Sequence, residues 1–378
     1  MSRLFSPLAL RGLTLRNRTV VAPMCQYSAR HGLANDWHLV QLGRFGVGGF
    51  GLVIAEATGV LPEARITYGD TGLWEEAQIE PFARIVSFLH AQGAAAGIQL
   101  AHAGRKASTS VPWRDPAPRT AAEKAAVAFE HWTPVAPSPI AHSANPDYQT
   151  PAELDAAGIV RTIEAFAAAA RRADAAGFDV VEVHAAHGYL INQFLSPLAN
   201  QRSDGYGGSR ANRMRFALEV VEAVRAAWPA DKPLFVRISA TDGSPGGWTI
   251  EDSVVLAGEL KSRGVDLVDC SSGGFEGYSL KPAPLYQVPL AEAVRAAGLP
   301  TMAVGLITGP ADAEAILAEG RADLVALARG ALDDPNWPLH ARLALEGGEA
   351  ASYSQWPVQA RDRVRSMDRV LGRHRSAG

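Results

Sequence analysis

The stretch Asp179-Val-Val-Glu-Val-His184-Ala-Ala-His187-Gly-Tyr189-Leu decides how the rest of the chain is interpreted. Its first half is a short valine-rich run, which is typical of a strand buried on both faces of a parallel sheet. Two imidazoles and a phenol follow where this run ends. In barrel enzymes, the loops at the carboxyl ends of the strands carry the chemistry. The stretch therefore predicts a strand leading into a site that binds an anionic group and donates a proton.

Each of these side chains alone has a simpler interpretation. His184 would be a core histidine with satisfied hydrogen bonds, and Tyr189 an ordinary loop aromatic. Three such groups at one strand end, followed by Asn192-Gln-Phe-Leu-Ser-Pro, favour a functional site instead.

Composition limits the class of protein. The chain has 378 residues, which suits one α/β barrel with insertions, and 47% of them are hydrophobic. The net charge of −3 gives no indication of a nucleic-acid or membrane partner, so we expect a small-molecule substrate. Cys25 and Cys270 are the only cysteines, too few for a disulfide framework or a four-cysteine iron–sulfur cluster. With no apparent signal peptide or spanning segment, we expect a cytoplasmic location.

Short apolar runs recur along the chain and mostly alternate with helical patterns. They comprise Thr19–Ala22, Leu52–Ala55, Ala96–Leu100, Asp179–His184, Leu234–Ile238, Val265–Cys270, Thr301–Val304 and Asp323–Ala328. The helical stretches include Ile250–Arg263 and Pro310–Glu319, the second with proline at its start. Right-handed strand–helix repetition gives a parallel sheet, and eight units close it into a (β/α)8 TIM barrel. An open doubly wound sheet is the less favoured alternative.

The alternation of strands and helices is interrupted between Ala103 and about Pro151, where no clear strand is visible. This segment is rich in proline and contains Trp113 and Trp132, so we expect it to pack as a lid or subdomain over the site. We therefore predict a single barrel over residues 1–350, with an insertion at about 103–151, and a C-terminal tail over residues 351–378.

The glycine pattern Gly46-Val-Gly-Gly-Phe-Gly51 resembles a dinucleotide-binding fingerprint. That fingerprint needs a strand before it and a helix after it. Here a helical stretch, Asp36–Phe45, precedes the glycines and the strand Leu52–Ala55 follows them. We interpret the pattern as a helix-to-strand loop.

The expected strand ends present a ring of polar residues. Gln99 ends the third strand with an amide that donates and accepts hydrogen bonds, and Arg237 places a permanent charge at the fifth. Gly305 and Arg329 follow the last two strands, where such barrels often bind phosphate. Together these positions predict a phosphate-bearing cofactor across the barrel mouth.

Longer motifs make the chain resemble one known family. They are Ala22-Pro-Met-Cys25-Gln-Tyr27, Gln99-Leu-Ala-His-Ala-Gly-Arg105, His184-Ala-Ala-His187-Gly-Tyr189, Phe194-Leu-Ser-Pro-Leu-Ala-Asn-Gln-Arg202, Asp204-Gly-Tyr-Gly-Gly-Ser209, Val304-Gly-Leu-Ile307 and Ala328-Arg-Gly330. Over nearly its whole length the chain resembles the Old Yellow Enzyme family of FMN-dependent ene-reductases, in particular the thermophilic-like branch. Ala211 departs from the pattern, which has glutamate there; we take that glutamate as structural.

The resemblance implies a role for each matching residue in cofactor binding. Non-covalent FMN would contact Pro23, Met24, Cys25, Ala57, Gln99, Arg237, Gly273, Gly305 and Arg329. Cys25 would tune the flavin near its reactive edge, and Arg237 would face the N1 and O2 edge, which becomes negative on reduction.

The resemblance also implies a reaction. NADPH or NADH would reduce the flavin, and an α,β-unsaturated carbonyl compound, or another activated alkene such as a maleimide or nitro compound, would then be reduced. His184 and His187 would bind the substrate oxygen, Tyr27 would contact the ligand, and Tyr189 would protonate the substrate. The alternatives are an FMN dehydrogenase or oxidase of another type, a non-enzymatic flavin-binding protein, and a metal-dependent barrel hydrolase that uses the two histidines as ligands.

In the tail, Trp356-Pro-Val-Gln359 resembles a segment of the thermophilic-like branch that ends with an arginine entering a neighbouring active site. Arg363 matches that arginine by spacing, with Arg361 as a rival, whereas Ala360 stands where an aromatic is expected. The simpler interpretation is a solvated basic tail. We expect a homodimer or homotetramer in which Arg363 contacts substrate or nicotinamide.

Overall fold

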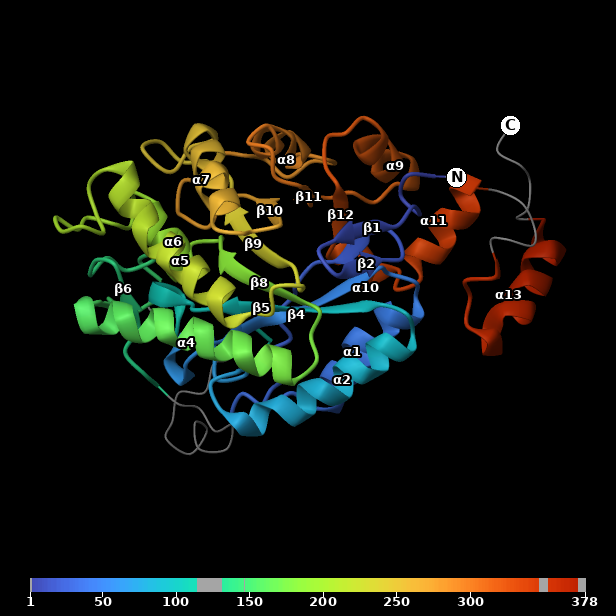
Figure 1. Cartoon of the computed structure of the whole chain (residues 1–378), viewed down its shortest axis with the longest axis horizontal. Helices are drawn as coiled ribbons and strands as arrows, with labels where there is room; N and C mark the ends of the chain where they lie inside the picture. Colours follow the sequence, from blue (N-terminus) through green and yellow to red (C-terminus); the bar gives the residue numbers. More distant parts are fainter. Residues whose placement is uncertain (1, 114–130, 146, 347–352, 373–378) are drawn as a thin grey trace.

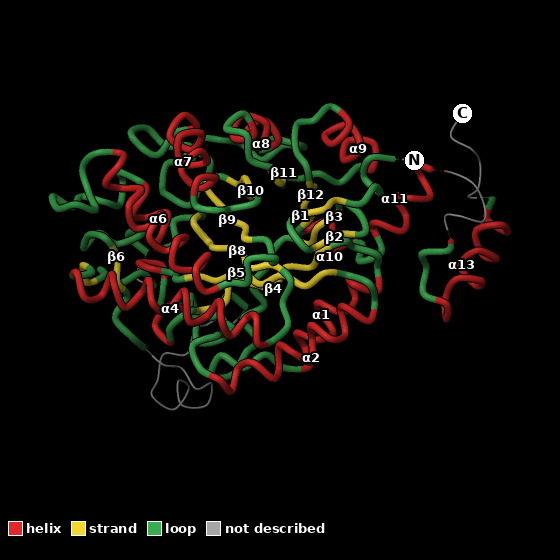
Figure 2. The backbone as a smooth tube through the Cα atoms, in the orientation of Figure 1, coloured by secondary structure: helices red, strands yellow, loops and turns green. Residues whose placement is uncertain are grey.

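A closed barrel of parallel strands forms the centre of the molecule, and helices surround it (Figures 1 and 2). The computed structural model describes residues 2–113, 131–145, 147–346 and 353–372. The barrel strands, in spatial order, are β10 (Leu267–Ser271), β11 (Thr301–Ala303), β12 (Leu324–Leu327), β3 (Thr19–Val21), β4 (Leu52–Gly59), β5 (Ala95–Ala101), β8 (Val180–Ala185) and β9 (Leu234–Ser239). Sequential order around a closed ring confirms the predicted (β/α)8 barrel over an open sheet.

Each strand lies within two residues of its expected position, except at the end of β4. The apolar run Leu52–Ala55 predicted only the first half of this strand. The strand continues through Glu56 to Gly59 because a bulge between Ala55 and Ala57 shifts its register against β5. A bulge redirects side chains near a site, and this one displaces Ala57 relative to the regular alternation.

The helices that cover the barrel follow the strands and begin at clear sequence signals. They are α1 (Asp36–Val47), α2 (Ile79–Ala91), α4 (Ala156–Ala175), α5 (Leu190–Leu195), α6 (Arg210–Ala227), α7 (Ile250–Ser262), α8 (Val288–Arg295), α9 (Pro310–Ala318), α10 (Arg329–Asp333) and α11 (Trp337–Glu346). Asp155, Ser209 and Thr249 cap three of them by accepting backbone N–H groups. In the described residues, no helix is both long and apolar enough to span a membrane.

The barrel floor is closed by a hairpin that the sequence did not indicate. Strands β1 (Leu8–Leu10) and β2 (Leu13–Leu15) pair antiparallel before the first barrel strand. Their side chains Leu10 and Leu15 join an apolar cluster inside the barrel, which includes Val180, Phe235, Leu267, Met302 and Leu324. With this end filled, the opposite end, where the strands reach their carboxyl termini, is the one left to carry the site.

The insertion after β5 contains more order than its composition suggested. The prediction of no strand there was wrong, because β6 (Val135–Ala136) pairs in parallel with β7 (Ala152–Glu153). Packing of the tryptophans is clear for Trp132, whose indole N–H donates to the Glu63 carbonyl oxygen at 2.8 Å. Trp113 remains 57% exposed but packs edge-on against Tyr27. Residues 114–130 and 146 lie outside the described residues, so the lid role stays a prediction.

The tail ends in a helix that stands apart from the barrel. Helix α13 (Val358–Leu371) lies beyond α11 at one edge of the molecule (Figure 1). Just before it, Tyr353 and Trp356 pack on Leu339 of α11 as a small separate cluster. Trp356 is therefore fixed by packing against α11, and residues 347–352 lie outside the described part of the chain.

Candidate active site

The three residues of the defining stretch come together at the carboxyl end of β8. His184 is the last inward-facing residue of the strand, and His187 and Gly188 turn the chain with φ of 59° and 70°. A Cβ on Gly188 would lie 2.1 Å from the Gly274 carbonyl oxygen, so only glycine allows the loops after β8 and β10 to approach this closely. The turn directs both imidazoles and the phenol toward one another.

The two imidazoles are held as neutral donors of complementary tautomer. Their ring centroids lie 5.2 Å apart, nearly perpendicular. Nδ1 of His184 accepts from the backbone N–H of Ala186, which leaves its proton on Nε2. Nε2 of His187 lies 2.7 Å from the hydroxyl of Ser271, and that hydroxyl accepts in turn from Gln287. We therefore assign the hydroxyl as donor to His187, whose own proton is then on Nδ1.

Burial keeps both imidazoles uncharged. It lowers the pKa of His184 and His187 well below the ordinary value, and the positive charges of Arg237 and Lys106 lower both further. Each ring thus offers one N–H to an oxygen bound between them. Within the described residues, no group of three or more histidine, cysteine or carboxylate side chains is arranged to hold a metal ion.

Tyr189 stands beside this pair as a protonated phenol. Its ring centroid lies 4.9 Å from that of His184. Burial raises the pKa of Tyr189 well above its ordinary value, and neighbouring acidic groups, Cys25 first, act in the same direction. A phenol with a raised pKa keeps its proton at neutral pH and gives it up only to a strongly basic centre.

Lys106 belongs to the site although sequence reasoning missed it. Its Nζ lies 4.9 Å from the centroid of the Tyr189 ring and donates to the His187 carbonyl oxygen at 3.0 Å. Burial lowers its pKa to about 8, with help from the charge of Arg105. The available signal was its position directly after the motif that ends at Arg105.

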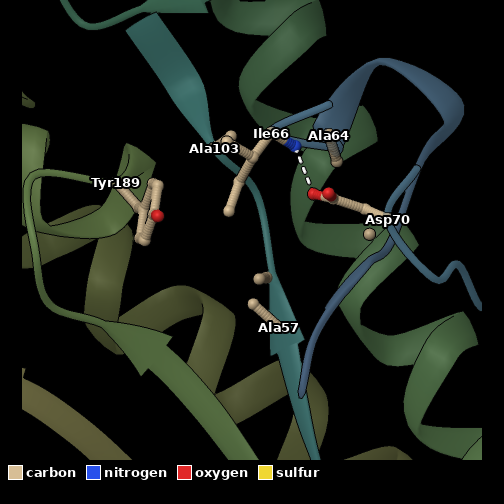
Figure 3. A pocket seen from close by; sticks show the side chains of 8 residues that line it. Ala57, Ala64, Ile66, Asp70, Ala103 and Tyr189 are labelled. Carbon is tan, nitrogen blue, oxygen red and sulfur yellow. Dashed lines mark hydrogen bonds between the residues drawn. The ribbon is translucent and has the colours of Figure 1, made fainter. Parts of the chain in front are cut away.

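Next to Tyr189 is a pocket walled by small side chains (Figure 3). Ala57 and Gly59 come from β4, Ala101 from β5 and Ala103 from the residues that follow it. Tyr189 lies across the pocket from Ala57 and Ala103 (Figure 3). Small residues along one wall and polar side chains at the barrel mouth suit a flat, partly polar ring system such as a flavin.

Cys25 and Tyr27 lie on the loop after β3, on the same side of the mouth. The Cys25 thiol is half-buried, and burial raises its pKa, as do the nearby carboxyls of Asp70 and Glu56. It is therefore a neutral thiol, the form that donates a weak hydrogen bond. The loop is fixed by the backbone N–H of Gln26, which donates to Glu56. Pro23 and Met24 precede Cys25 on this loop and are half-buried as well.

Gln99 and Arg237 lie deeper, inside the barrel. Nε2 of Gln99 donates to Oε1 of Glu182 at 2.8 Å, and Nε of Arg237 lies 3.0 Å from Oδ2 of Asp269. The two carboxylates beneath them were not singled out from the sequence. They come from strands far apart in the chain, and no local pattern marks their pairing.

Gly305 and Arg329, which were predicted to bind phosphate, and the predicted cofactor contact Gly273 follow three neighbouring strands. Gly273 comes after β10 with φ of 80°, Gly305 after β11 with φ of 119°, and Arg329 opens α10 directly after β12. Arg329 is exposed and free to reach an anion at this rim. The expected cofactor residues thus lie on the barrel strands or directly after them, with Gln99 and Arg237 deeper than the others. Arg363, on α13, is not among them.

A parallel barrel with a buried, protonated phenol and two neutral imidazoles at its strand ends is typical of cofactor-dependent barrel enzymes. Residues 3–346 match the model of the NADH:flavin oxidoreductase / NADH oxidase family. The chain is 48% identical to an NADPH dehydrogenase of Geobacillus thermodenitrificans (strain NG80-2), over 89% of this chain and 93% of that protein. It is 44% identical to an NADPH dehydrogenase of Halalkalibacterium halodurans, over 91% and 95%.

Solved structures agree with this assignment. Morphinone reductase superposes with a TM-score of 0.72 at 30% identity and covers 94% of this chain and 96% of its own. A 2-naphthoyl-CoA reductase gives a TM-score of 0.79 at 27% identity, but this chain covers only 51% of that larger protein. The chain belongs to the NADH:flavin oxidoreductase family, which includes the Old Yellow Enzymes. It is a flavin-dependent oxidoreductase whose cofactors are FMN and a nicotinamide nucleotide.

Proposed function

We propose that this enzyme reduces the activated C=C bond of α,β-unsaturated carbonyl compounds, with Tyr189 as the proton donor. The observation that carries this proposal is the cluster at the end of β8. The ring centroid of His184 lies 5.2 Å from that of His187 and 4.9 Å from that of Tyr189, and Tyr189 lines a pocket with mostly small side chains. During reduction such a substrate develops negative charge on its oxygen, which two neutral N–H donors can stabilise. Its α-carbon becomes basic, and a protonated phenol can protonate it.

The imidazoles bind the carbonyl oxygen. Nε2–H of His184 and Nδ1–H of His187 would both donate to it, and the hydrogen bonds strengthen as negative charge develops there. Ser271 and the Ala186 backbone hold the tautomers, so no reorientation is needed during the reaction. Lys106, beneath the His187 carbonyl, fixes the turn and adds positive potential.

Tyr189 supplies the proton to the α-carbon. Bound FMN would supply the hydride, taken from NADPH and delivered from its N5 atom to the β-carbon. Ala57, Ala101 and Ala103 present only small side chains where the ring would lie, and Gln99 and Arg237 would contact its pyrimidine side. Gly273, Gly305 and Arg329 would hold the phosphate, Cys25 would lie near the reactive edge, and Tyr27 would contact the substrate.

Anaerobic stopped-flow spectroscopy tests the proposal by separating the two half-reactions. Flavin absorbance should disappear with NADPH or NADH and recover on mixing with cyclohexenone or N-methylmaleimide. An oxidase of another type would recover its absorbance with oxygen and not with the alkenes. A flavin-binding protein without activity would show neither change on the timescale of turnover.

A further inference from the structure

Beneath the expected flavin position, the barrel interior carries a layer of charged side chains that the proposed chemistry does not use. On three adjacent strands the inward-facing positions repeat in the same order, an apolar residue on the floor, a charged residue in the middle and a polar residue at the mouth. These sets are Val180, Glu182, His184 on β8; Phe235, Arg237, Ser239 on β9; and Leu267, Asp269, Ser271 on β10. The middle layer thus lies between the apolar floor and the site.

The two carboxyls of this layer are fully buried and incompletely paired. Glu182 and Asp269 are both 0% exposed. Asp269 lies 3.0 Å from Nε of Arg237, but without the geometry of a hydrogen bond. Among the described residues, neither oxygen of Asp269 nor Oε2 of Glu182 has a hydrogen-bond partner.

Such an arrangement does not serve the stability of the fold. An unpaired buried carboxylate oxygen costs free energy, and a buried ion pair is often replaceable by apolar side chains without loss. What the carboxyls do contact is specific: Glu182 accepts from Gln99, and Asp269 faces Arg237. These are the two residues proposed to face the pyrimidine side of the flavin.

We infer that Glu182 and Asp269 are positioning residues for the flavin: they orient Gln99 and Arg237 and set the charge beneath the ring, and thereby control its reduction potential. This inference rests on the proposed contacts of Gln99 and Arg237 with FMN. Two-electron reduction places negative charge at the edge that Arg237 would face. A carboxylate beneath Arg237 offsets part of that cation's attraction and holds the potential lower than Arg237 alone would.

The protonation states of Glu182 and Asp269 depend on burial and on the charged groups that face them. The charged groups that face Glu182 are Arg237 from β9 and Asp269 from β10, whereas β5 contributes the uncharged Gln99 and its own strand the neutral His184. Burial first, and then the charge of Asp269, raise the pKa of Glu182 to about 8 against the opposing effects of Arg237 and Gln99. Burial also raises the pKa of Asp269, and the charge of Arg237 opposes this. Because Asp269 lies 3.0 Å from the guanidinium of Arg237, whereas Glu182 accepts from the uncharged Gln99, we assign the proton to Glu182 and the negative charge to Asp269.

The first test is the flavin reduction potential of purified holoenzyme. Asp269→Asn removes the ionised carboxylate, so the ratio of reduced to oxidised flavin at a fixed potential should rise about tenfold, which is about 30 mV for a two-electron couple. Asp266→Asn is the matched control, since Asp266 precedes the same strand and pairs with Arg11 at the opposite end of the barrel. The control should leave the potential unchanged.

The second test uses pH. Glu182→Gln should match the wild-type potential at pH 6.5, where Glu182 is already neutral. Above pH 8 the wild-type potential should fall more steeply than that of the variant, because ionised Glu182 disfavours the added negative charge. If Asp269→Asn yields no soluble holoenzyme, the comparison of wild type with Glu182→Gln tests the inference by itself. Identical plots of reduction potential against pH from pH 6 to 10 would overturn it.

An arginine variant separates this inference from the proposed flavin site. Arg237→Met should lower the potential if Arg237 faces the flavin. A lowered potential in that variant together with an unchanged one in Asp269→Asn refutes the positioning role only. Unchanged potentials in both variants would show that the flavin does not lie over Arg237, and the proposed cofactor contacts would fail with it.

Discussion

Loss of the Tyr189 phenol should slow the oxidative half-reaction and leave the reductive half-reaction nearly unchanged. In Tyr189→Phe, FMN binding and reduction by NADPH should stay near normal, because neither uses the phenol. Reoxidation by an enone should slow by about 10²–10⁴-fold, the usual effect of losing a general acid. Stopped-flow measurement of each half-reaction gives both rates. Tyr206→Phe is the matched control, since the Tyr206 hydroxyl donates to Glu219, away from the site. Equal slowing of both half-reactions would reject Tyr189 as the donor.

The imidazole pair should dominate affinity for phenolic ligands, which mimic a substrate with negative charge on oxygen. Each hydrogen bond to such an anion contributes about 1.5–3 kcal/mol, so a His184→Ala/His187→Ala double variant should lose nearly all binding. The long-wavelength absorption band of a phenolate stacked on oxidised flavin reports the complex. A His90→Ala/His340→Ala variant removes two more exposed imidazoles, each paired with an aspartate, and should bind normally. A site variant with its full band and full FMN content would contradict the assignment.

The pH dependence of the oxidative half-reaction follows from the lowered pKa of both imidazoles. They stay neutral well below pH 6.5, so the rate of enone reoxidation should show no break near that pH between about 5.5 and 7.5. The lowered pKa values also determine the direction in which the stability of the fold changes with pH. Because the unfolded chain binds more protons once pH falls below about 6.5, these residues make the fold less stable on acidification. His187→Gln should therefore lose less stability between pH 6.5 and 5 in urea unfolding than wild type.

At the scale of elements, the turn between β8 and α5 depends on the loop after β10. Gly188→Ala would place a methyl 2.1 Å from the Gly274 carbonyl oxygen in addition to straining a φ of 70°. Gly208→Ala has a comparable φ of 77° but meets nothing within 4 Å. Both variants should lose about 1–2 kcal/mol for the backbone conformation, and Gly188→Ala clearly more. Only Gly188→Ala should also weaken the binding of phenolic ligands, because it displaces His187. Calorimetry measures the loss of stability, and ligand titration measures the loss of affinity.

The elements that sequence predicted best are those specified by nearby residues. Apolar runs such as Leu234–Ile238 and Asp179–His184 mark buried strands locally, and the polar residue at each strand end is positioned with them. The β1–β2 hairpin and the β6–β7 pair were missed because their short strands are partly or fully exposed, whereas the equally short β3 and β11 are buried throughout. Glu182 and Asp269 were missed as partners for a different reason. Their contact with Gln99 and Arg237 depends on register between strands, which no single stretch reveals.

At the scale of the whole molecule, the tail is the part that lies outside the barrel. The sequence could not predict that the tail packs against α11. The contact is a cluster of residues from separate segments, Leu339 on α11 with Tyr353 and Trp356 of the tail. Arg361 is held within the tail, since its guanidinium donates to the carbonyl oxygens of Ser354 and Trp356. Arg363 is exposed on α13. This favours Arg363 over Arg361 as the residue available to a neighbouring subunit.

The surface of α13 itself suits burial against another copy. Val358, Met367, Val370 and Leu371 are between 47% and 85% exposed on one helix. Such a set of apolar side chains is more typical of an interface than of a solvated tail. We expect a homodimer, or a tetramer built from dimers, with a self-complementary contact that includes this helix.

The variant Arg363→Ala tests the tail and the assembly together. If Arg363 enters a neighbouring site, the variant should keep its FMN and its oligomeric state but bind nicotinamide or enone more weakly by about 1–3 kcal/mol. Titration of the oxidised enzyme with a non-reducing nicotinamide analogue and with a phenol gives the two affinities, and light scattering gives the mass. Arg295→Ala is the control, because it removes an equal charge from a surface pair with Asp323. A fully active monomer at assay concentration, or unchanged affinities in Arg363→Ala, would leave α13 as a surface helix with no part in the site.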